Sequence, residues 1–390
     1  MKVLIVTNLY PPHARGGAER VAELQARGFE DAGHEVAVLT SGPNFGLGTE
    51  MQDGIKVYRF FPWNIFWYKN IGKYSFWVRA LWHLIDALNL QSLWVLHHVL
   101  EQENPDIIIS HNLKGLGLQI FAALSNRKDK WVHVLHDIQL SIPSGLMIWG
   151  EEDKWENSVA RKWHESFCRG LVGSPRTIIS PSRWLLGFYT NKGFFKESKT
   201  VVLPNPVDLV GEIQPEPGKR LRMLYVGQIE EHKGVPWLAR KIKKLGGNWE
   251  LKIVGVGSKI DALKEIVKDD ERIKVFGVKS RSEMGAIFAD SDILIVPSKC
   301  YENSPTVVYE SLAHGVPVLV ARIGGAGELI QENKNGWTFE PGSDKELLDR
   351  LEQVIAEPEI LQNMRAACRD SVAEYNLKNY IHTFLKMINQ

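Results

Sequence analysis

Residues 292–320 read DILIVPSKCYENSPTVVYESLAHGVPVLV, and the two ends of this stretch differ from its middle. DILIVPS and VPVLV are near-continuous apolar runs, typical of strands in a parallel sheet that is covered on both faces. Between them we expect a helix over 305–314, because Ser304 can cap its start, proline suits its first position and Gly315 suits its end. A strand, a helix and a second strand form one repeat of an α/β sheet. The stretch therefore predicts a doubly wound α/β domain.

The same alternation of short apolar runs and helix-length segments extends through most of the chain. Strands are expected at 2–8, 35–40, 55–60, 106–112, 131–136, 177–182 and 200–205, and again in the runs RMLYVG, ELKIVG and IKVFG. Between the two series, the weakly apolar segment 205–220 is typical of an interdomain linker. We therefore expect two doubly wound Rossmann-like domains facing a cleft, one over 1–205 and one over 206–374. A final helix at about 375–390 is expected to pack back on the first domain.

The composition argues against several classes of protein. The 390 residues carry 47 basic and 46 acidic side chains, so no charge excess suggests a nucleic-acid partner. Cys168, Cys300 and Cys368 stand at unrelated spacings, which predicts neither a disulfide framework nor a zinc cluster. The sequence has no signal-peptide pattern and no run of about twenty uncharged apolar residues, so a cytoplasmic protein is expected.

The start of the expected helix carries the features of an anion site. The amides of Thr306, Val307 and Val308 lack acceptors within the helix, and the positive end of the helix dipole lies beside them. Glu302 and Glu310 flank these amides. Carboxylates repel a phosphate, but they can accept hydrogen bonds from hydroxyls on either side of it. The pattern indicates a nucleotide sugar, and a pair of solvated glutamates is the simpler alternative.

Three segments then resemble one family of enzymes. ENSPTVVYE (302–310) resembles the E-x7-E motif of retaining glycosyltransferases of the GT-B fold, glycosyltransferase family 4. VGQIEEHKG (226–234) resembles the phosphate-contacting turn of that family, and NLYPPHARGGAE (8–19) resembles its glycine-rich loop. The resemblance extends over essentially the whole chain. It implies that Glu302 contacts the donor sugar and that Glu310 contacts the ribose.

One position departs from the family pattern. The resemblance implies that Lys233 stabilises the departing diphosphate, but Gln228 stands where the family usually carries an arginine. Glutamine donates hydrogen bonds without adding positive charge. Either Lys233 and the helix amides suffice, or Arg281 or Arg322 supplies the missing charge.

Two histidines lie at the ends of expected strands of the first domain. His136 resembles the family histidine near the reacting face of the sugar, and His111 is an acceptor-side candidate at a similar strand end. We expect His136, Lys233 and Glu302 to be catalytic. Backbone near Gly277 and Val278 is expected to meet the nucleotide base. The expected donor-binding residues are Gly16, Gly17, Gln228, Gly277, Val278, Asn303, Ser304, Thr306, Val307, Val308 and Glu310.

The resemblance implies a retaining glycosyltransferase that moves a sugar from a nucleotide sugar to a hydroxyl acceptor, without a metal or other cofactor. The acceptor would be a glycan or a lipid-linked glycan in bacterial surface polysaccharide or glycolipid synthesis. The alternatives are a nucleotide-sugar epimerase, a phosphorylase of the same fold and a non-catalytic protein that binds sugar nucleotides. Asp290 and Asp292 have the spacing of a metal-binding pair, but they precede their strand, so a capping or solvated role is expected.

Tryptophans are concentrated between residues 60 and 100. Over 60–74, Trp63 and Trp67 lie near Lys69 and Lys73 without a clear period, which suggests an exposed patch at a bilayer surface. We therefore expect peripheral attachment to the inner face of a membrane there. A helical stripe follows and is expected to pack in the core. Its members are Trp77, Leu81, Leu84, Leu88, Val95 and Val99.

Overall fold

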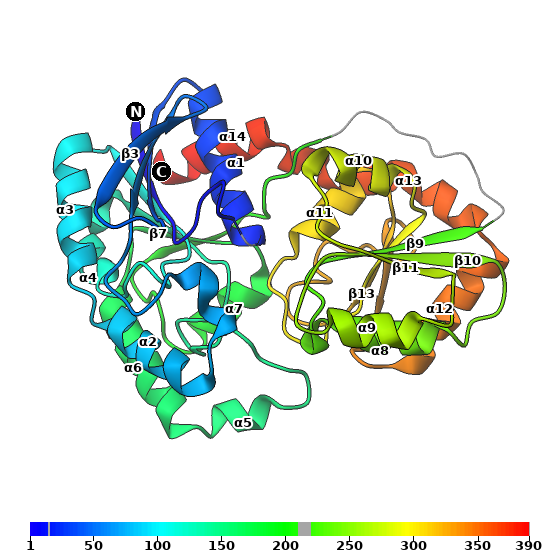
Figure 1. Ribbon diagram of the computed structural model, residues 1–390. Coiled ribbons are helices and arrows are strands. Elements are labelled where there is room, and N and C mark those ends of the chain that lie inside the picture. The colour runs from blue at the N-terminus through cyan, green and yellow to red at the C-terminus, as the bar shows by residue number, and fades with distance from the viewer. Residues whose placement is uncertain (15, 210–219, 390) are drawn as a thin grey trace. The chain divides into compact units, whose positions relative to one another are not determined.

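The computed structural model describes residues 1–14, 16–209 and 220–389, and the chain divides into two compact units (Figure 1). The first unit comprises Met1–Gly145, Glu156–Pro206 and Leu377–Gln390, and the second comprises Leu146–Trp155 and Val207–Asn376. Residues 210–219 of the expected linker lie outside the described residues. Among the described residues, no helix is both long and apolar enough to span a bilayer.

The first unit is built on a sheet of eight strands in the order β3-β4-β2-β1-β5-β6-β7-β8. Neighbouring strands are parallel, except that β3 runs antiparallel to β4. The strands are β1 (Lys2–Val6), β2 (Glu35–Ser41), β3 (Leu47–Gln52), β4 (Ile55–Phe60), β5 (Ile107–Ser110), β6 (Trp131–Val134), β7 (Thr177–Ser180) and β8 (Lys199–Val202). The order reverses direction between β1 and β5, so the carboxyl ends of these two strands mark a place where ligands commonly bind.

Helices connect these strands and cover the sheet (Figure 1). They are α1 (Gly17–Asp31), α2 (Phe76–Ala87), α3 (Gln91–Glu103), α4 (Ile120–Ser125), α6 (Val159–Val172), α7 (Arg183–Thr190) and α14 (Leu377–Asn389), with the 3-10 turns η1 (Tyr68–Lys73) and η2 (Lys128–Lys130). Helix α5 (Glu152–Glu156) lies where the ranges of the two units meet.

The last helix of the chain belongs to the first unit. Helix α14 packs on α1, where Gln25 Nε2 donates to the Tyr380 hydroxyl over 2.7 Å. The rings of Phe29 and Phe384 meet edge to face with centroids 5.4 Å apart. Gly28 allows this approach, because a Cβ atom there would lie 2.6 Å from the side chain of Ile381. The apolar contacts between α1 and α14 therefore hold the end of the chain on the first unit.

The second unit has a six-stranded parallel sheet in the order β11-β10-β9-β12-β13-β14. Its strands are β9 (Leu221–Val226), β10 (Trp249–Val254), β11 (Ile273–Phe276), β12 (Ile293–Val296), β13 (Val318–Ala321) and β14 (Gly336–Phe339). Its helices are α8 (Val235–Ile242), α9 (Ile260–Val267), α10 (Arg281–Ala289), α11 (Thr306–Ala313), α12 (Asp344–Ala356) and α13 (Glu359–Val372), with η3 (Glu231–Lys233) and η4 (Ala373–Tyr375). This strand order is that of a dinucleotide-binding Rossmann sheet, whose direction reverses between β9 and β12.

The predicted fold class of two doubly wound α/β domains is confirmed, and two details of the quoted stretch are corrected. Helix α11 begins at Thr306, with Pro305 rather than Ser304 as its N-cap. The Ser304 hydroxyl instead contacts the Tyr309 hydroxyl at 2.6 Å. The amide of Val308 donates to the Pro305 carbonyl over 3.0 Å, so this amide is not available to a ligand.

The expected roles of the aromatic residues between 60 and 100 are partly wrong. Trp63 is 66% exposed, but Trp67 is buried and its indole N–H donates to Ser41 Oγ over 2.8 Å. Val95 and Val99 are buried as expected. The other members of the stripe are exposed instead, because α2 packs on the unit through a different face that contains Trp82. These exposed side chains are Trp77, Leu81, Leu84 and Leu88.

Candidate functional site

The turns that follow β9 and β12 contact each other in the second unit. Lys233, in the 3-10 turn after β9, places its Nζ 2.6 Å from Glu302 Oε1, in the loop after β12. The Ser298 hydroxyl donates to the same carboxylate oxygen over 2.7 Å. Two residues that the sequence assigned to catalysis therefore meet at the point where the strand order reverses.

The electrostatics of this pair favour the ionised form of both groups. Burial raises the pKa of the Glu302 carboxyl, but the Lys233 ammonium outweighs it and holds that pKa below its usual range. Burial likewise lowers the pKa of Lys233, and the charge of Glu302 overcomes this and makes the net shift upward. The pair is thus an ammonium and a carboxylate at neutral pH. Without a ligand, Glu302 compensates the positive charge of Lys233.

Glycines allow the backbone to bring these two turns together. A Cβ atom at Gly234, which has a φ of +74°, would lie 1.9 Å from the carbonyl oxygen of Pro297. On the other side of the site, a Cβ atom at Gly324 would lie 2.1 Å from the carbonyl oxygen of Glu302. The Gly325 amide donates to that carbonyl over 2.7 Å. The loop after β13 therefore fixes the backbone of Glu302, and the turn after β9 lies directly against the end of β12.

The first turn of α11 follows Glu302 after three residues. The amides of Thr306 and Val307 lie in this turn, where the helix supplies no carbonyl acceptor, and they carry the positive end of the helix dipole. The side chain of Val308 is buried in the core and that of Glu310 is half-buried. Asn303 is half-buried in the same loop. Two of the three expected amides therefore remain suited to an anion.

The remaining expected donor-binding residues of this unit follow other strands. Gln228 is exposed just after β9, and its carbonyl oxygen accepts a hydrogen bond from the Tyr225 hydroxyl over 2.8 Å. Gly277 and Val278 are exposed after β11, the edge strand of the sheet, which β10 separates from β9. Neither expected substitute for the missing arginine contacts the Lys233 pair in the described residues. Arg281 forms an ion pair with Asp208, and Arg322 is exposed after β13.

Asp290 is the C-cap residue of α10, but Asp292 is buried, and both carboxylates form ion pairs in place of a merely capping or solvated role. Arg222 places Nη1 2.8 Å from Asp290 Oδ1 and Nη2 2.8 Å from Asp292 Oδ1. Arg365 approaches Asp292 Oδ1 to 3.2 Å from a second side. Over residues 1–14, 16–209 and 220–389, no group of three or more His, Cys, Asp or Glu side chains is arranged to hold a metal ion.

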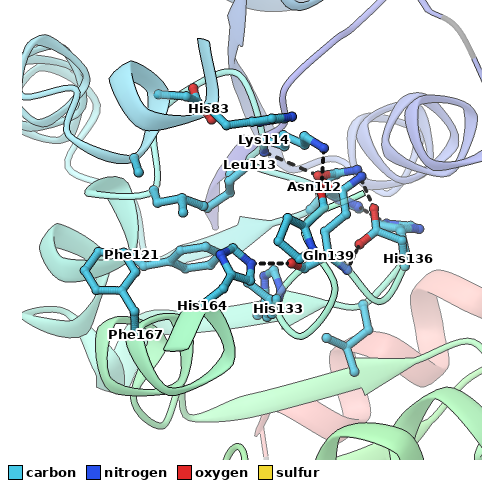
Figure 2. Close-up of a pocket in the computed structure, with 18 of the residues that line it drawn as sticks. His83, Asn112, Leu113, Lys114, Phe121, His133, His136, Gln139, His164 and Phe167 are labelled. Atoms are coloured by element: carbon cyan, nitrogen blue, oxygen red, sulfur yellow. Dashed lines mark hydrogen bonds between the residues drawn. The ribbon is translucent and has the colours of Figure 1, made fainter. Parts of the chain in front are cut away.

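A separate pocket of about 240 Å³ lies in the first unit, between the ends of β5 and β6 and the helices α2 and α6. Figure 2 shows His83, from α2, on one side of it and His164 and Phe167, from α6, on the other. His111 and His136 both line the pocket, and their Nδ1 and Nε2 atoms lie 2.8 Å apart. The two histidines that the sequence singled out are therefore in contact.

The residues that follow the two histidines form a second contact between the ends of β5 and β6. Asn112 Nδ2 donates to Asp137 Oδ2 over 2.8 Å, so the pairs His111-Asn112 and His136-Asp137 are linked by two hydrogen bonds. Asn112 and Asp137 were not among the site residues expected from the sequence. The signal for them in the sequence was that the expected strands 106–112 and 131–136 each have, at their end, a histidine followed by a polar residue.

Burial keeps the two histidines of this cluster uncharged at neutral pH. It lowers the pKa of His136 to about 4 and moves the pKa of His111 well below its usual range. Burial also raises the pKa of the Asp137 carboxyl to about 6. The Nε2 atom of His111 is buried without a hydrogen-bond partner among the described residues. This ring nitrogen can bind a hydroxyl that enters the pocket.

The glycine-rich loop lies elsewhere in the first unit, after β1. Gly16 is the N-cap of α1 and Gly17 is its first residue. The Gly16 amide donates to Glu19 Oε2 over 2.9 Å, so this amide is already used in capping the helix.

Comparison with known proteins places both halves of the chain in one group. Residues 15–210 match the description Glycosyltransferase Family 4, and residues 211–371 match Glycosyl transferases group 1. A Klebsiella pneumoniae protein described as an uncharacterized 42.6 kDa protein in the cps region is 24% identical over 88% of this chain and 91% of its own length.

Solved structures show the same two-domain fold. The lipopolysaccharide outer core galactosyltransferase WaaB, in its apo form, is similar with a TM-score of 0.69 at 18% identity, over 100% of this chain and 99% of that chain. Anabaena HepE in complex with UDP is similar with a TM-score of 0.72 at 17% identity, over 100% of both chains. These are GT-B glycosyltransferases. Since the family description covers half of the sequence, the chain belongs to glycosyltransferase family 4.

Proposed function

We propose that this glycosyltransferase moves a sugar from a nucleotide-sugar donor to a hydroxyl of an acceptor, with retention at the anomeric carbon. The observation that carries the proposal is the contact between Lys233 and Glu302 beside the first turn of α11. A cation, a carboxylate and helix amides that have no acceptor within the helix together match a ligand in which a diphosphate adjoins a sugar. The UDP complex of the similar protein HepE supports this choice of ligand class.

Different parts of the donor would bind different groups of the site, according to their charge. The diphosphate takes the amides of Thr306 and Val307 and the ammonium of Lys233, while Glu302 accepts hydrogen bonds from sugar hydroxyls. Glu310, farther along α11, accepts from the ribose. In this arrangement the donor takes the place of Glu302 as the main negative partner of Lys233. The compensated pair thus becomes a cation on the phosphate and a carboxylate on the sugar.

The rate would depend mainly on stabilising charge that develops on the departing diphosphate. Breaking the bond between the sugar and the phosphate leaves an oxocarbenium-like sugar and a more negative diphosphate. Lys233 and the α11 amides are fixed in position before the reaction, so they can stabilise this charge without reorganising. We propose that they do so without a divalent metal, and that the acceptor attacks from the side of the leaving group.

The acceptor is assigned to the pocket of the first unit. His136 and His111 are neutral at pH 7, so one of their ring nitrogens can accept a proton or hydrogen bond from an acceptor hydroxyl. The lipopolysaccharide substrate named for WaaB supports a glycan or lipid-linked acceptor, used in the synthesis of a surface polysaccharide or glycolipid. Peripheral contact with a membrane would bring the protein to such an acceptor.

The test is binding followed by turnover. Thermal unfolding is measured with UDP-, GDP- and ADP-sugars, since a ligand that binds only the folded protein raises its apparent stability. Release of the nucleotide is then measured with and without candidate acceptors for the donor that binds. We expect one donor class to stabilise the protein and an acceptor to accelerate release. Release that needs no acceptor, or no stabilisation by any donor, contradicts the proposal.

A further inference from the structure

Helix α2 presents an apolar face to the solvent. Its exposed side chains are Trp77 (79%), Leu81 (51%) and Leu84 (59%), continued by Leu88 (60%) just after the helix. At about 100° per residue, these positions lie within roughly 60° of one another around the helix axis. The opposite face buries Trp82 and already anchors α2 to the unit. The exposed stripe therefore lies on a different side of α2 from this anchor.

Helix α6 presents a second set of apolar side chains across the pocket. They are Val159 (68%), Trp163 (75%) and Phe167 (45%). Leu84 of α2 and Phe167 of α6 are exposed and also line the pocket that contains His111 and His136. Exposed apolar side chains therefore border the pocket on both its α2 side and its α6 side. We call these seven residues the α2–α6 surface.

The solvent-exposed charged side chains of the two helices are positive. The carboxylate of α2, Asp86, is buried, and that of α6, Glu165, is buried and paired with Arg161 at 2.6 Å. The exposed charged side chains of these helices are those of Arg79 and Lys162. The last residue of η1, Lys73, adds another exposed positive charge just before α2. On α2 and α6 themselves the exposed charges are positive and the carboxylates are buried, which is complementary to an anionic lipid surface.

We infer that the α2–α6 surface docks on an anionic lipid bilayer. The two tryptophans and the leucines enter the interfacial region, while Arg79 and Lys162 lie at the level of the lipid headgroups. Docking in this way turns the mouth of the pocket toward the bilayer. A lipid-linked acceptor can then enter the pocket directly from the membrane, and only this last consequence rests on the proposed function.

The experiment is co-sedimentation of the full chain with vesicles of phosphatidylcholine, alone or mixed with phosphatidylglycerol. We expect binding to the mixed vesicles that weakens as salt is added. The double variant Trp77→Ser/Leu81→Gln should lower the partition coefficient by about tenfold or more, because it removes two inserted side chains. Arg79→Glu/Lys162→Glu should weaken binding to the mixed vesicles. The matched control Phe45→Ser/Met51→Gln removes side chains of the same unit that are 85% and 67% exposed, and it should bind like the parent.

Three results would overturn the inference. The parent chain fails to sediment with anionic vesicles at low salt, or the control variant loses as much binding as Trp77→Ser/Leu81→Gln. In the third, light scattering without vesicles shows an oligomer that Trp77→Ser/Leu81→Gln dissociates, which assigns the surface to contact between copies of the chain. Nucleotide-sugar binding is measured without vesicles, so failure of the proposed function leaves the vesicle result unaffected.

Discussion

Lys233 Nζ and Glu302 Oε1 lie 2.6 Å apart although 69 residues separate them in the sequence. The ion pair forms because β9 and β12 are neighbours in the sheet and both turns follow their carboxyl ends. In a site proposed to bind a diphosphate, the partner of a lysine limits how strongly that lysine attracts the ligand. If the site binds a diphosphate as proposed, each member of the pair should affect both binding and turnover.

Replacing Lys233 by alanine should slow sugar transfer by roughly 10² or more, because the departing diphosphate loses its positioned cation. Steady-state kinetics with the donor that binds would measure this change. Lys243→Ala is the matched control, since Lys243 also pairs with an acidic residue, Asp269, on the surface of the same unit. If the rate of Lys233→Ala stays within a factor of about two of the parent rate, another residue stabilises the departing diphosphate.

Replacing Glu302 by glutamine should separate binding from turnover. Without the carboxylate, the charge of Lys233 is uncompensated, so a nucleoside diphosphate should bind about fivefold to tenfold more tightly. Transfer should slow, since a neutral amide accepts weaker hydrogen bonds from the sugar than a carboxylate does. Calorimetric titration with the nucleoside diphosphate and steady-state rates measure the two effects. Weaker binding of the diphosphate by Glu302→Gln would show that Glu302 does not compensate Lys233.

Glu310→Ala should weaken binding of the whole nucleotide with little effect on the rate at saturating donor, because the ribose does not change during the reaction. Titration of the nucleotide, together with kcat and KM, measures this separation. Glu352→Ala on α12 removes an exposed glutamate of the same unit and serves as the control. Unchanged nucleotide affinity in a folded Glu310→Ala protein would contradict the ribose assignment.

The parallel sheets could be predicted because their strands are continuous apolar runs, whereas two strands were missed for physical reasons. Strand β3 is largely exposed and pairs only with β4, so its polar sequence LGTEMQ carries no burial signal. Strand β14 is a four-residue edge strand between polar turns. The segment Leu146–Trp155 groups with the second unit, although its position in the sequence lies within the first. Contacts of this kind depend on the tertiary fold and leave no local pattern.

The candidate site was predictable residue by residue but not as pairs. Lys233, Glu302, His111 and His136 each follow a strand, which sequence periodicity reveals. Which of these residues contact each other depends on the order of strands in each sheet. That order cannot be predicted from any single segment of the sequence. Helix α2 shows a similar limit: it is apolar on two faces, so the period alone could not tell that Trp82 is buried and Leu84 exposed.

Acid should destabilise the first unit through its buried histidines. Burial lowers the pKa of His133 to about 3, from an ordinary value near 6.5 in the unfolded chain. The unfolded chain therefore binds more protons over this interval. The stabilisation is present above about pH 6.5 and is lost as pH falls toward 3. Burial raises the pKa of Asp86 to about 7 and of Asp137 to about 6. These two carboxyls act in the opposite direction, because their contribution to the stability of the folded protein decreases as pH rises.

A variant isolates the histidine from these carboxyls. The free energy of unfolding of the parent minus that of His133→Gln, measured in urea at several pH values, cancels contributions that the two proteins share. This difference should fall by a few kcal/mol between pH 7 and pH 4. A difference that stays constant with pH would show that His133 is not buried in its neutral form.

Gly234 should be intolerant of a side chain, because its Cβ position is occupied by the Pro297 carbonyl at the end of β12. Gly234→Ala should cost about 3 kcal/mol or more in the free energy of unfolding, and it should reduce transfer by displacing Lys233 from Glu302. Gly342 is the matched control: its φ of +77° is nearly the same as the +74° of Gly234, but among the described residues no atom beyond its chain neighbours lies within 4 Å of its Cβ position. Gly342→Ala should therefore lower the free energy of unfolding by only about 1–2 kcal/mol, which is the cost of a side chain on a left-handed backbone. It should leave transfer unchanged. Denaturant unfolding and steady-state rates of both variants separate steric contact from backbone strain. Equal losses in the two would mean that close contact with β12 does not hold the Lys233 turn in place.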